Sequence, residues 1–249
     1  MEFKEDAALI TGGASGIGLA TAQLLAERGV RVAIADIDDV AGEKAVNAIA
    51  ARGGTAIFVR ADVTSEASVQ QLVDTTVQEL GPIRYAFNNA GTAQAYTLTH
   101  EMDEGTFDKV FALNAKGVFL CMKAEISHML AHGGGSIVNT ASGAGTKAVA
   151  GMPAYVGSKH AVIGLTRNAA IEYVRDSIRV NAIAPGTVAT PMITSMSADQ
   201  QDLYAQAVPL GRLGTPEEIA KTAAFLLSED SSFTTGTVLS IDGGFTQKQ

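Results

Sequence analysis

Short apolar runs alternate with longer amphipathic stretches along almost the whole chain. Apolar side chains that recur every three or four positions predict helices, and short apolar runs bounded by glycine, proline or polar residues predict buried strands. The predicted strands cover residues 7–11, 30–35, 55–60, 84–88, the run that ends at Ser142, 177–184 and 237–241. The predicted helices cover 19–28, 40–51, 65–80 and 107–129, with two more that begin at Tyr155 and Pro216. This alternation predicts an α/β protein with a doubly wound, mostly parallel seven-stranded sheet and helices on both faces.

Length and composition fit one domain. The chain has 249 residues, of which 47% are hydrophobic, enough for a substantial core. No repeat, linker or low-complexity segment interrupts it, so we expect a single domain over residues 1–249. The formal net charge is -8, and lysine and arginine are scattered without a basic run. Nucleic acid is therefore not an expected partner.

The first residues, MEFKEDAALI, lack a basic start followed by an apolar run, and no run of 18 apolar residues occurs. We therefore expect a soluble cytoplasmic protein with no membrane partner. The single cysteine, Cys121, excludes an internal disulfide, and with four scattered histidines it offers no pattern of metal ligands. Its apolar surroundings favour a buried packing residue.

A glycine-rich turn lies between the first strand and the first helix. Its sequence from Gly12 to Gly18 is GGASGIG. Glycines in this context allow the backbone to turn tightly against a pyrophosphate at the N-terminus of the following helix, although a glycine-rich loop can also be a plain turn. Asp36 closes the next strand, where a carboxylate can accept hydrogen bonds from both hydroxyls of an adenosine ribose. The alternative is an exposed strand-end acid without a ligand.

The most reactive combination follows the fifth strand. Tyr155 and Lys159 are four residues apart at the start of a predicted helix, so their side chains point the same way, and Ser142 closes the strand before them. A nearby ammonium favours the phenolate and moves the tyrosine toward service as a general base. Taken alone, the pair is more often a half-buried tyrosine beside a solvated lysine.

The motifs TGGASGIG, Asn88-Asn-Ala-Gly91, Asn114, Ser142, YVGSK and Pro185-Gly186 occur in this order. Together they resemble the short-chain dehydrogenase/reductase family, in its short single-domain form with a Rossmann-type fold. The resemblance covers about residues 7–244. One departure is Gly157 within YVGSK, where alanine is more usual; it should cost the helix up to about 1 kcal/mol.

The resemblance implies roles for particular residues. The catalytic set would be Asn114, Ser142, Tyr155 and Lys159, with Asn114 holding a water in a proton relay; without the resemblance, Asn114 would be read as a satisfied packing residue. The implied cofactor contacts are Gly12, Ser15, Gly16, Ile17, Gly18, Asp36, Ile37, Asp62, Val63, Asn89, Ala90, Gly91, Tyr155, Lys159, Pro185, Gly186, Val188 and Thr190. For Asp62, a cap on the helix that begins near Ser65 is comparably favoured by the sequence.

The expected activity is hydride transfer between NAD and a secondary alcohol or ketone, with NAD preferred over NADP because of Asp36 and Ile37. By family position the substrate pocket would include Gln94, Tyr96, Ala144, Thr146 and Met152, beneath a mobile cover over residues 191–209. These residues suggest a neutral, modestly apolar small molecule. We also expect a homotetramer. A catalytically silent NAD-binding sensor or scaffold is the alternative.

Overall fold

The computed structural model describes residues 1–4 and 6–247 and contains one seven-stranded sheet. The strands are β1 Ala7–Thr11, β2 Arg31–Asp36, β3 Ala56–Arg60, β4 Ile83–Asn88, β5 Gly135–Thr140, β6 Ile178–Pro185 and β7 Val238–Ile241. They lie in the order β3-β2-β1-β4-β5-β6-β7, and every neighbouring pair is parallel. The predicted fold class is therefore confirmed.

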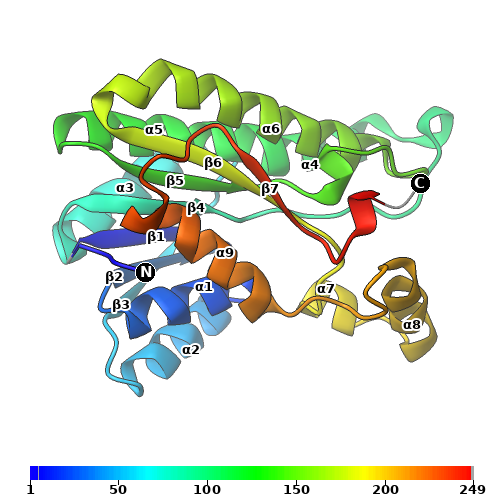
Figure 1. Ribbon diagram of the computed structural model, residues 1–249, viewed down its shortest axis with the longest axis horizontal. Coiled ribbons are helices and arrows are strands. Elements are labelled where there is room, and N and C mark those ends of the chain that lie inside the picture. Colours follow the sequence, from blue (N-terminus) through cyan, green and yellow to red (C-terminus); the bar gives the residue numbers. More distant parts are fainter. Residues whose placement is uncertain (5, 248–249) are drawn as a thin grey trace.

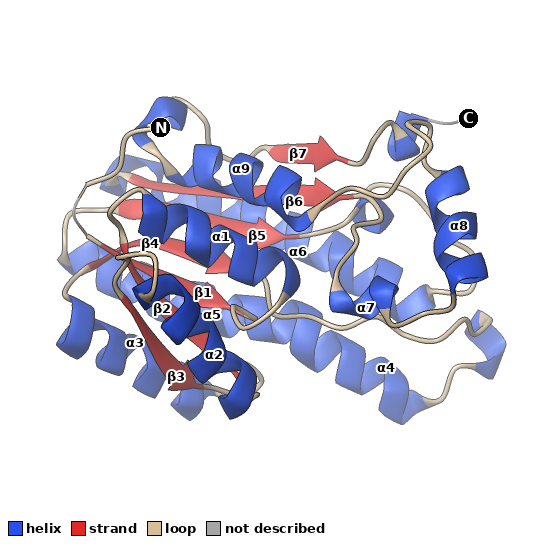
Figure 2. Ribbon diagram, turned by 90° about the horizontal axis from the view of Figure 1, so that it is seen from below, coloured by secondary structure: helices blue, strands red, loops and turns tan. Residues whose placement is uncertain are grey.

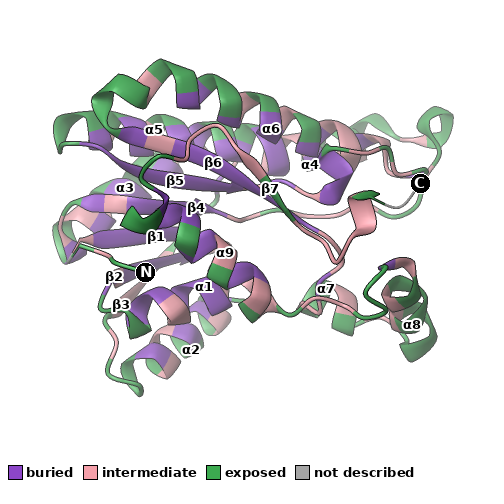
Figure 3. Ribbon diagram, in the orientation of Figure 1, coloured by how far each residue is buried: buried purple, intermediate pink, exposed green. Residues whose placement is uncertain are grey.

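Helices cover both faces of this sheet (Figure 1). One face carries α1 Gly16–Glu27, α2 Asp39–Ala50 and α9 Pro216–Leu227, and the other carries α3 Glu66–Leu80, α5 Gly117–Ala131 and α6 Pro153–Tyr173. Figure 3 shows buried positions along the strands and on the sides of the helices that face them. No helix in the described part of the chain is long and apolar enough to cross a membrane.

The strands supply side chains to both apolar layers by simple alternation. Leu9 and Ala33 belong to the core under α3, α5 and α6, whereas Ile10 and Ile34 belong to the core under α1, α2 and α9. Strands buried on both faces in this way have the continuous apolar sequences from which they were predicted. Cys121 is buried, as expected, in a smaller apolar cluster with Val63.

The helix predicted over residues 107–129 is wrong as one regular element. The structure divides the region into α4 Glu104–Phe111, a π-helical turn Ala112–Lys116 and α5. A π turn inserts one residue into the helical hydrogen-bond pattern, and such turns are frequent at functional sites. Asn114 lies in this turn, so the irregularity determines where its side chain points.

The carboxyl ends of the strands form the edge at which the predicted site residues gather. The chain leaves β1 toward β2 and β3 on one side and returns through β4 on the other, so the strand order reverses between β1 and β4. Ligands of open α/β sheets bind at such a reversal. Beyond this edge lie α7 Pro191–Thr194 and α8 Ala198–Ala207 (Figure 2).

Candidate active site

The glycine turn after β1 is shaped by close backbone contacts. A Cβ atom on Gly18 would lie 2.1 Å from the Gly12 carbonyl oxygen and 2.8 Å from Asn89 Nδ2, so no side chain fits there. Asn89 Nδ2 donates to the same Gly12 carbonyl at 3.2 Å. The turn after β1 is thereby tied to the turn after β4 across the reversal in strand order.

The N-terminus of α1 is left open for an anion. Its N-cap residue, Ser15, makes no side-chain capping hydrogen bond, and no acid occupies the first turn. By contrast, α2, α3, α4, α8 and α9 are capped by their own Asp38, Ser65, Asp103, Ser197 and Thr215. Free backbone N–H groups and the positive end of the helix dipole suit a diphosphate. This end of α1 therefore fits the cofactor that the glycine turn predicted.

Asp36 lies at the end of β2 beside the glycine turn. Its Oδ2 accepts from the Ala14 N–H at 3.2 Å, and its Oδ1 accepts from the N–H groups of Ile37 at 2.8 Å and Asp38 at 3.3 Å. These bonds hold the carboxylate against the turn that would carry the diphosphate. The Ile37 side chain is exposed.

Asp62 does not cap α3, so that alternative is wrong. Ser65 is the cap, accepting from the Ser68 N–H at 3.4 Å, while Asp62 Oδ1 accepts from the Thr64 N–H and hydroxyl at 2.9 and 2.7 Å. The bonds from Thr64 lower the pKa of Asp62. The Val63 side chain is buried beneath Gly117, which leaves its backbone as the part available to a ligand.

The turn Asn89–Gly91 is held by Thr11 of β1. The Thr11 hydroxyl accepts from the N–H groups of Asn89 and Ala90 at 3.1 and 3.2 Å. A Cβ on Gly91 would lie 3.1 Å from Asn114 Oδ1 and 3.6 Å from Lys159 Nζ. Gly91 therefore leaves room for Asn114 and Lys159 to approach one another.

Ser142, Tyr155 and Lys159 come together, as predicted. The Ser142 hydroxyl is hydrogen-bonded to the Tyr155 phenol, and Lys159 Nζ lies 5.7 Å from the centre of the Tyr155 ring. Lys159 is only 4% exposed and donates to the Thr140 carbonyl at 2.7 Å. Its burial lowers the pKa of Lys159 to about 8.

Burial of Tyr155 opposes the expected ionisation of the phenol below its ordinary pKa. Burial of the phenol raises the pKa of Tyr155, and the hydrogen bond from Ser142 offsets only part of that rise. The cause is desolvation, which disfavours the phenolate, while the Lys159 ammonium is bonded to the Thr140 carbonyl.

Asn114 is fully buried and bonded on both sides. Its Oδ1 accepts from the Thr92 N–H at 2.8 Å, and its Nδ2 donates to the Thr92 carbonyl at 2.9 Å and to Ser158 Oγ at 3.2 Å. Ser158 in turn donates to the Tyr155 carbonyl at 2.8 Å. Asn114 is thus part of the framework around Tyr155, and Oδ1 keeps a lone pair on the side of Gly91 and Lys159.

The remaining predicted contacts follow β6. Pro185 ends the strand, and Gly186 donates its N–H to the Ile241 carbonyl at 3.0 Å. The Val188 side chain is buried in the apolar core, but Thr190 reaches the glycine turn, because a Cβ on Gly16 would lie 3.1 Å from Thr190 Cγ2. The turn after β6 therefore faces the open end of α1.

Sequence reasoning missed three contributors: the Thr140 carbonyl, Ser158 and the C-terminal turn Phe245–Gln247. A Cβ on Gly143, the neighbour of Ser142, would lie 3.3 Å from both Phe245 Cδ1 and Thr246 Cγ2. Ser158 stands inside YVGSK and could have been noticed there. The other two depend on contacts between distant segments, for which the sequence carries no local signal.

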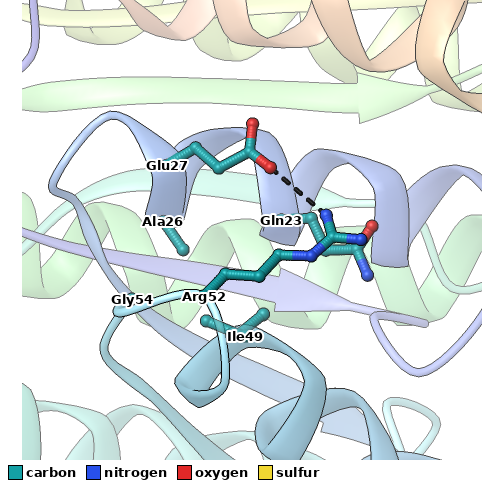
Figure 4. Close-up of a pocket in the computed structure, with 6 residues that line it drawn as sticks. All are labelled: Gln23, Ala26, Glu27, Ile49, Arg52 and Gly54. Carbon is teal, nitrogen blue, oxygen red and sulfur yellow. Dashed lines mark hydrogen bonds and ion pairs between the residues drawn. The ribbon is translucent and has the colours of Figure 1, made fainter.

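Two recesses lie away from this edge, and the larger one, between α3 and α5, has a volume of about 340 Å³ and is lined by Gln70, Asp74 and His128 among others. The recess between α1 and α2, bordered by the Glu27–Arg52 ion pair (N···O 3.3 Å), has a volume of about 10 Å³, room for one water (Figure 4). Within residues 1–4 and 6–247, no group of three or more His, Cys, Asp or Glu side chains could hold a metal ion.

Comparison with known proteins gives full-length similarities. A family model described as enoyl-(acyl carrier protein) reductase matches residues 12–246. Cis-4-hydroxycyclohexanecarboxylate dehydrogenase from Sinomonas cyclohexanicum is 43% identical over 98% of both chains. Cyclohexanol dehydrogenase from Acinetobacter sp. (strain SE19) is 42% identical over 99% of this chain and 97% of its own. The crystal structure of levodione reductase matches 100% of both chains, with a TM-score of 0.96 and 38% identity.

Proposed function

This chain belongs to the short-chain dehydrogenase/reductase family, and on that premise we propose that it transfers a hydride between NAD and the carbinol carbon of a cyclic secondary alcohol. It is an alcohol dehydrogenase or carbonyl reductase that uses a nicotinamide cofactor. The proposal rests mainly on one observation. Ser142, Tyr155 and Lys159 lie together at the carboxyl edge of the sheet, where the N-terminus of α1 has no side-chain cap.

In the proposed reaction the protein residues handle the proton and the oxygen. Ser142 holds the substrate hydroxyl through its own hydroxyl, and Tyr155 Oη accepts the proton from that hydroxyl as the hydride leaves carbon. Lys159 and Asn114 support the proton path behind the tyrosine. When bound, the oxidised nicotinamide ring supplies the hydride acceptor and a positive charge that lowers the pKa of Tyr155.

NAD is the proposed cofactor in preference to NADP. Asp36 is held beside the glycine turn by three backbone N–H groups, in position to accept from ribose hydroxyls. A 2′-phosphate there would approach a carboxylate, and the neighbouring positions Ala14, Ser15 and Ile37 provide no cation. We propose that three segments complete the cofactor groove: the glycine turn, Asp62 with Val63, and the turn at residues 185–190.

For the substrate we propose a neutral ring bearing a secondary hydroxyl. Two of the relatives compared above are named for cyclohexane-ring substrates, of which cyclohexanol is neutral and the other carries a carboxylate, so the names support the ring and its hydroxyl. Residues 191–209, which contain α7 and α8, are proposed as the cover of this pocket. Neither helix buries any residue fully, and Met192 and Leu203 are exposed, as expected of a cover that closes on a ligand.

We also propose a homotetramer. Apolar side chains are exposed on α5 and α6 (Phe119, Leu130 and Ile171) and near the sheet edge at β7 (Phe233 and Leu239). Exposed apolar surface of this kind marks contacts between proteins. We further propose that the protein is soluble and cytoplasmic.

The variant Tyr155→Phe tests the reaction. It removes the hydroxyl that exchanges the proton but keeps the ring, so turnover of cyclohexanol with NAD should fall by at least about a thousandfold. Binding of NADH, followed by its fluorescence, should change by less than about threefold. A Phe variant with an appreciable share of wild-type turnover would mean that Tyr155 is not the base. Loss of NADH binding would instead indicate misfolding.

A further inference from the structure

Gln94 uses its side chain to hold the backbone of Tyr155. It lies three residues after Gly91, and its Oε1 accepts from the Tyr155 N–H at 2.8 Å across 61 positions of sequence. Its Nε2 donates to the Gly151 carbonyl at 3.4 Å, just before the helix begins. Both polar ends of Gln94 are therefore engaged by the segment that starts α6.

The start of α6 provides no cap of its own. Its N-cap residue, Met152, makes no side-chain capping hydrogen bond, and Pro153 at the first helical position has no N–H. The N–H of Tyr155, in the first turn, is one of the groups that a helix normally satisfies through its N-cap side chain. Gln94 supplies that acceptor from another segment, whereas α2, α3, α4, α8 and α9 use their own cap residues.

The segment that carries Gln94 is itself well anchored. The Thr97 N–H donates to the Gly151 carbonyl at 2.9 Å. The Tyr96 ring covers Gly151, where a Cβ would lie 2.2 Å from Tyr96 Cε2. At the other end, Thr92 exchanges two hydrogen bonds with the Asn114 side chain. Gln94 therefore connects the Asn114 framework to the first turn of α6.

We propose that Gln94 is a positioning residue for Tyr155: its side-chain oxygen holds the first turn of α6 so that the phenol stays against Ser142, and it therefore governs turnover more than substrate affinity. This role differs from that of a pocket-lining residue, which would act through KM. The expected effect on kcat rests on the proposed function. The expected effect on the position of the Tyr155 phenol rests only on the contacts of Gln94.

Two variants separate the acceptor from the shape of the side chain. Gln94→Met keeps the length but removes the acceptor, and kcat should fall about tenfold with KM for alcohol and NAD within about twofold. Gln94→Glu keeps an oxygen acceptor at a helix N-terminus, where a negative charge is also favourable, and loses only the longer 3.4 Å bond to the Gly151 carbonyl, so kcat should stay within about threefold of wild type. The matched control is Asp103→Ala, which removes the cap of α4 and should lower the melting temperature without lowering kcat.

A second measurement does not depend on turnover. The chain has five tyrosines and no tryptophan, so the phenol titration of Tyr155 can be isolated by subtracting the spectrum of Tyr155→Phe. In Gln94→Met the released first turn should expose the phenol, and its titration should move toward that of a free tyrosine. Because the titration reports only the surroundings of the phenol, this shift is expected even if the turnover of Tyr155→Phe contradicts the proposed reaction.

Three results would overturn the role of Gln94. Equal loss of kcat in Gln94→Met and Gln94→Glu would show that the acceptor is not what matters. A raised KM with unchanged kcat would make Gln94 a substrate contact. Wild-type kcat and an unmoved Tyr155 titration in a folded Gln94→Met protein would show that α6 holds its first turn without Gln94.

Discussion

Three backbone N–H groups donate to the Asp36 carboxylate. These bonds hold the carboxylate oxygens in place, so a bound ribose would meet a preorganised acceptor. The same preorganisation makes it hard for the carboxylate to withdraw from a 2′-phosphate. The proposed selectivity for NAD over NADP therefore rests on one residue and its local backbone.

The variant Asp36→Asn should weaken the preference for NAD while keeping the fold. Like unit charges ~5 Å apart at an effective dielectric of ~20 repel by roughly 3 kcal/mol, so the wild-type ratio of kcat/KM for NAD over NADP should be on the order of a hundred. Removing the charge should reduce that ratio at least about tenfold. Comparable wild-type values for the two cofactors, or an unchanged ratio in the variant, would contradict the assignment.

Glu125 on α5 is a second residue whose charge has a clear consequence. It is fully buried; its Oε2 accepts from Asn88 Nδ2 at 2.9 Å, and its Oε1 has no partner within the described chain, nor has Asn88 Oδ1. Burial raises the pKa of Glu125 from 4.5 to about 7. A rise of that size corresponds to about 3 kcal/mol between the two protonation states.

We predict that Glu125→Gln stabilises the protein at alkaline but not at acidic pH. Below pH 4.5 Glu125 is protonated in both the folded and the unfolded state, so its burial carries no charge penalty. As the pH rises toward 7, the carboxyl ionises in the unfolded state but stays protonated in the folded state, and the free energy of unfolding falls. The loss of stability is complete above pH 7. The glutamine keeps one oxygen acceptor for Asn88 Nδ2 and places an amide N–H donor where the unpartnered Glu125 oxygen lies. Urea unfolding should show a gain of up to about 3 kcal/mol at about pH 8 and little change near pH 4.5. The exposed Glu172→Gln is the control, and a gain independent of pH would contradict the prediction.

At the scale of elements, α4 and α6 pack together through a glycine. A Cβ on Gly157 of α6 would lie 3.1 Å from Phe111 Cζ of α4, closer than ordinary van der Waals contact. Phe111 is itself stacked on Phe107, with 4.5 Å between ring centres. Gly157 therefore has a packing role that accounts for the departure from alanine noted in the sequence.

The effect of Gly157→Ala should depend on Phe111. Alanine improves helix propensity by up to about 1 kcal/mol, but its methyl group requires the Phe111 ring to move, so the single variant should change the free energy of unfolding by less than about 0.5 kcal/mol. In a Phe111→Leu background the gain should approach about 1 kcal/mol. Additive effects in this double-mutant cycle, measured by urea unfolding, would rule out the contact.

The elements were predictable because their signals are local. All seven strands match apolar runs in the sequence, and Asp36, Ser142, Tyr155 and Lys159 stand at strand ends or helix starts that those runs define. The π turn at Asn114 was not predicted, because Ala112–Lys116 has the composition of ordinary helix. The bond from Gln94 to Tyr155 and the raised pKa of Tyr155 depend on segments that meet only in the fold. The geometry of the individual site residues is therefore the part that needs a structure.

At the scale of the whole molecule, apolar side chains of α5, α6 and the β7 edge are exposed to solvent in the single chain. Ile171 on α6 is 78% exposed and Phe119 on α5 is 47% exposed. Closed symmetric assemblies are the usual way in which soluble proteins cover such faces. The α5 and α6 face could form one contact between copies of the chain and the β7 edge a second, different contact. A tetramer requires two such contacts.

Light scattering at micromolar concentration should report four copies of the chain. The paired variants Phe119→Glu and Ile171→Glu place charges on the helical face and should reduce the assembly to smaller species, while Glu172→Gln on the same helix should not. A monomeric wild-type protein under these conditions would refute the assembly.

The C-terminal turn Phe245–Gln247 has a practical implication for changing what the protein accepts. Phe245 and Thr246 pack on Gly143 beside Ser142, and a Cβ on Gly243 would lie 2.6 Å from Val208 Cγ1, at the base of the 191–209 segment. Substitutions at residues 243–246 would thus alter the surroundings of both Ser142 and the base of the 191–209 segment. Randomised libraries aimed at new ring sizes should therefore sample residues 243–246 together with those of α7 and α8.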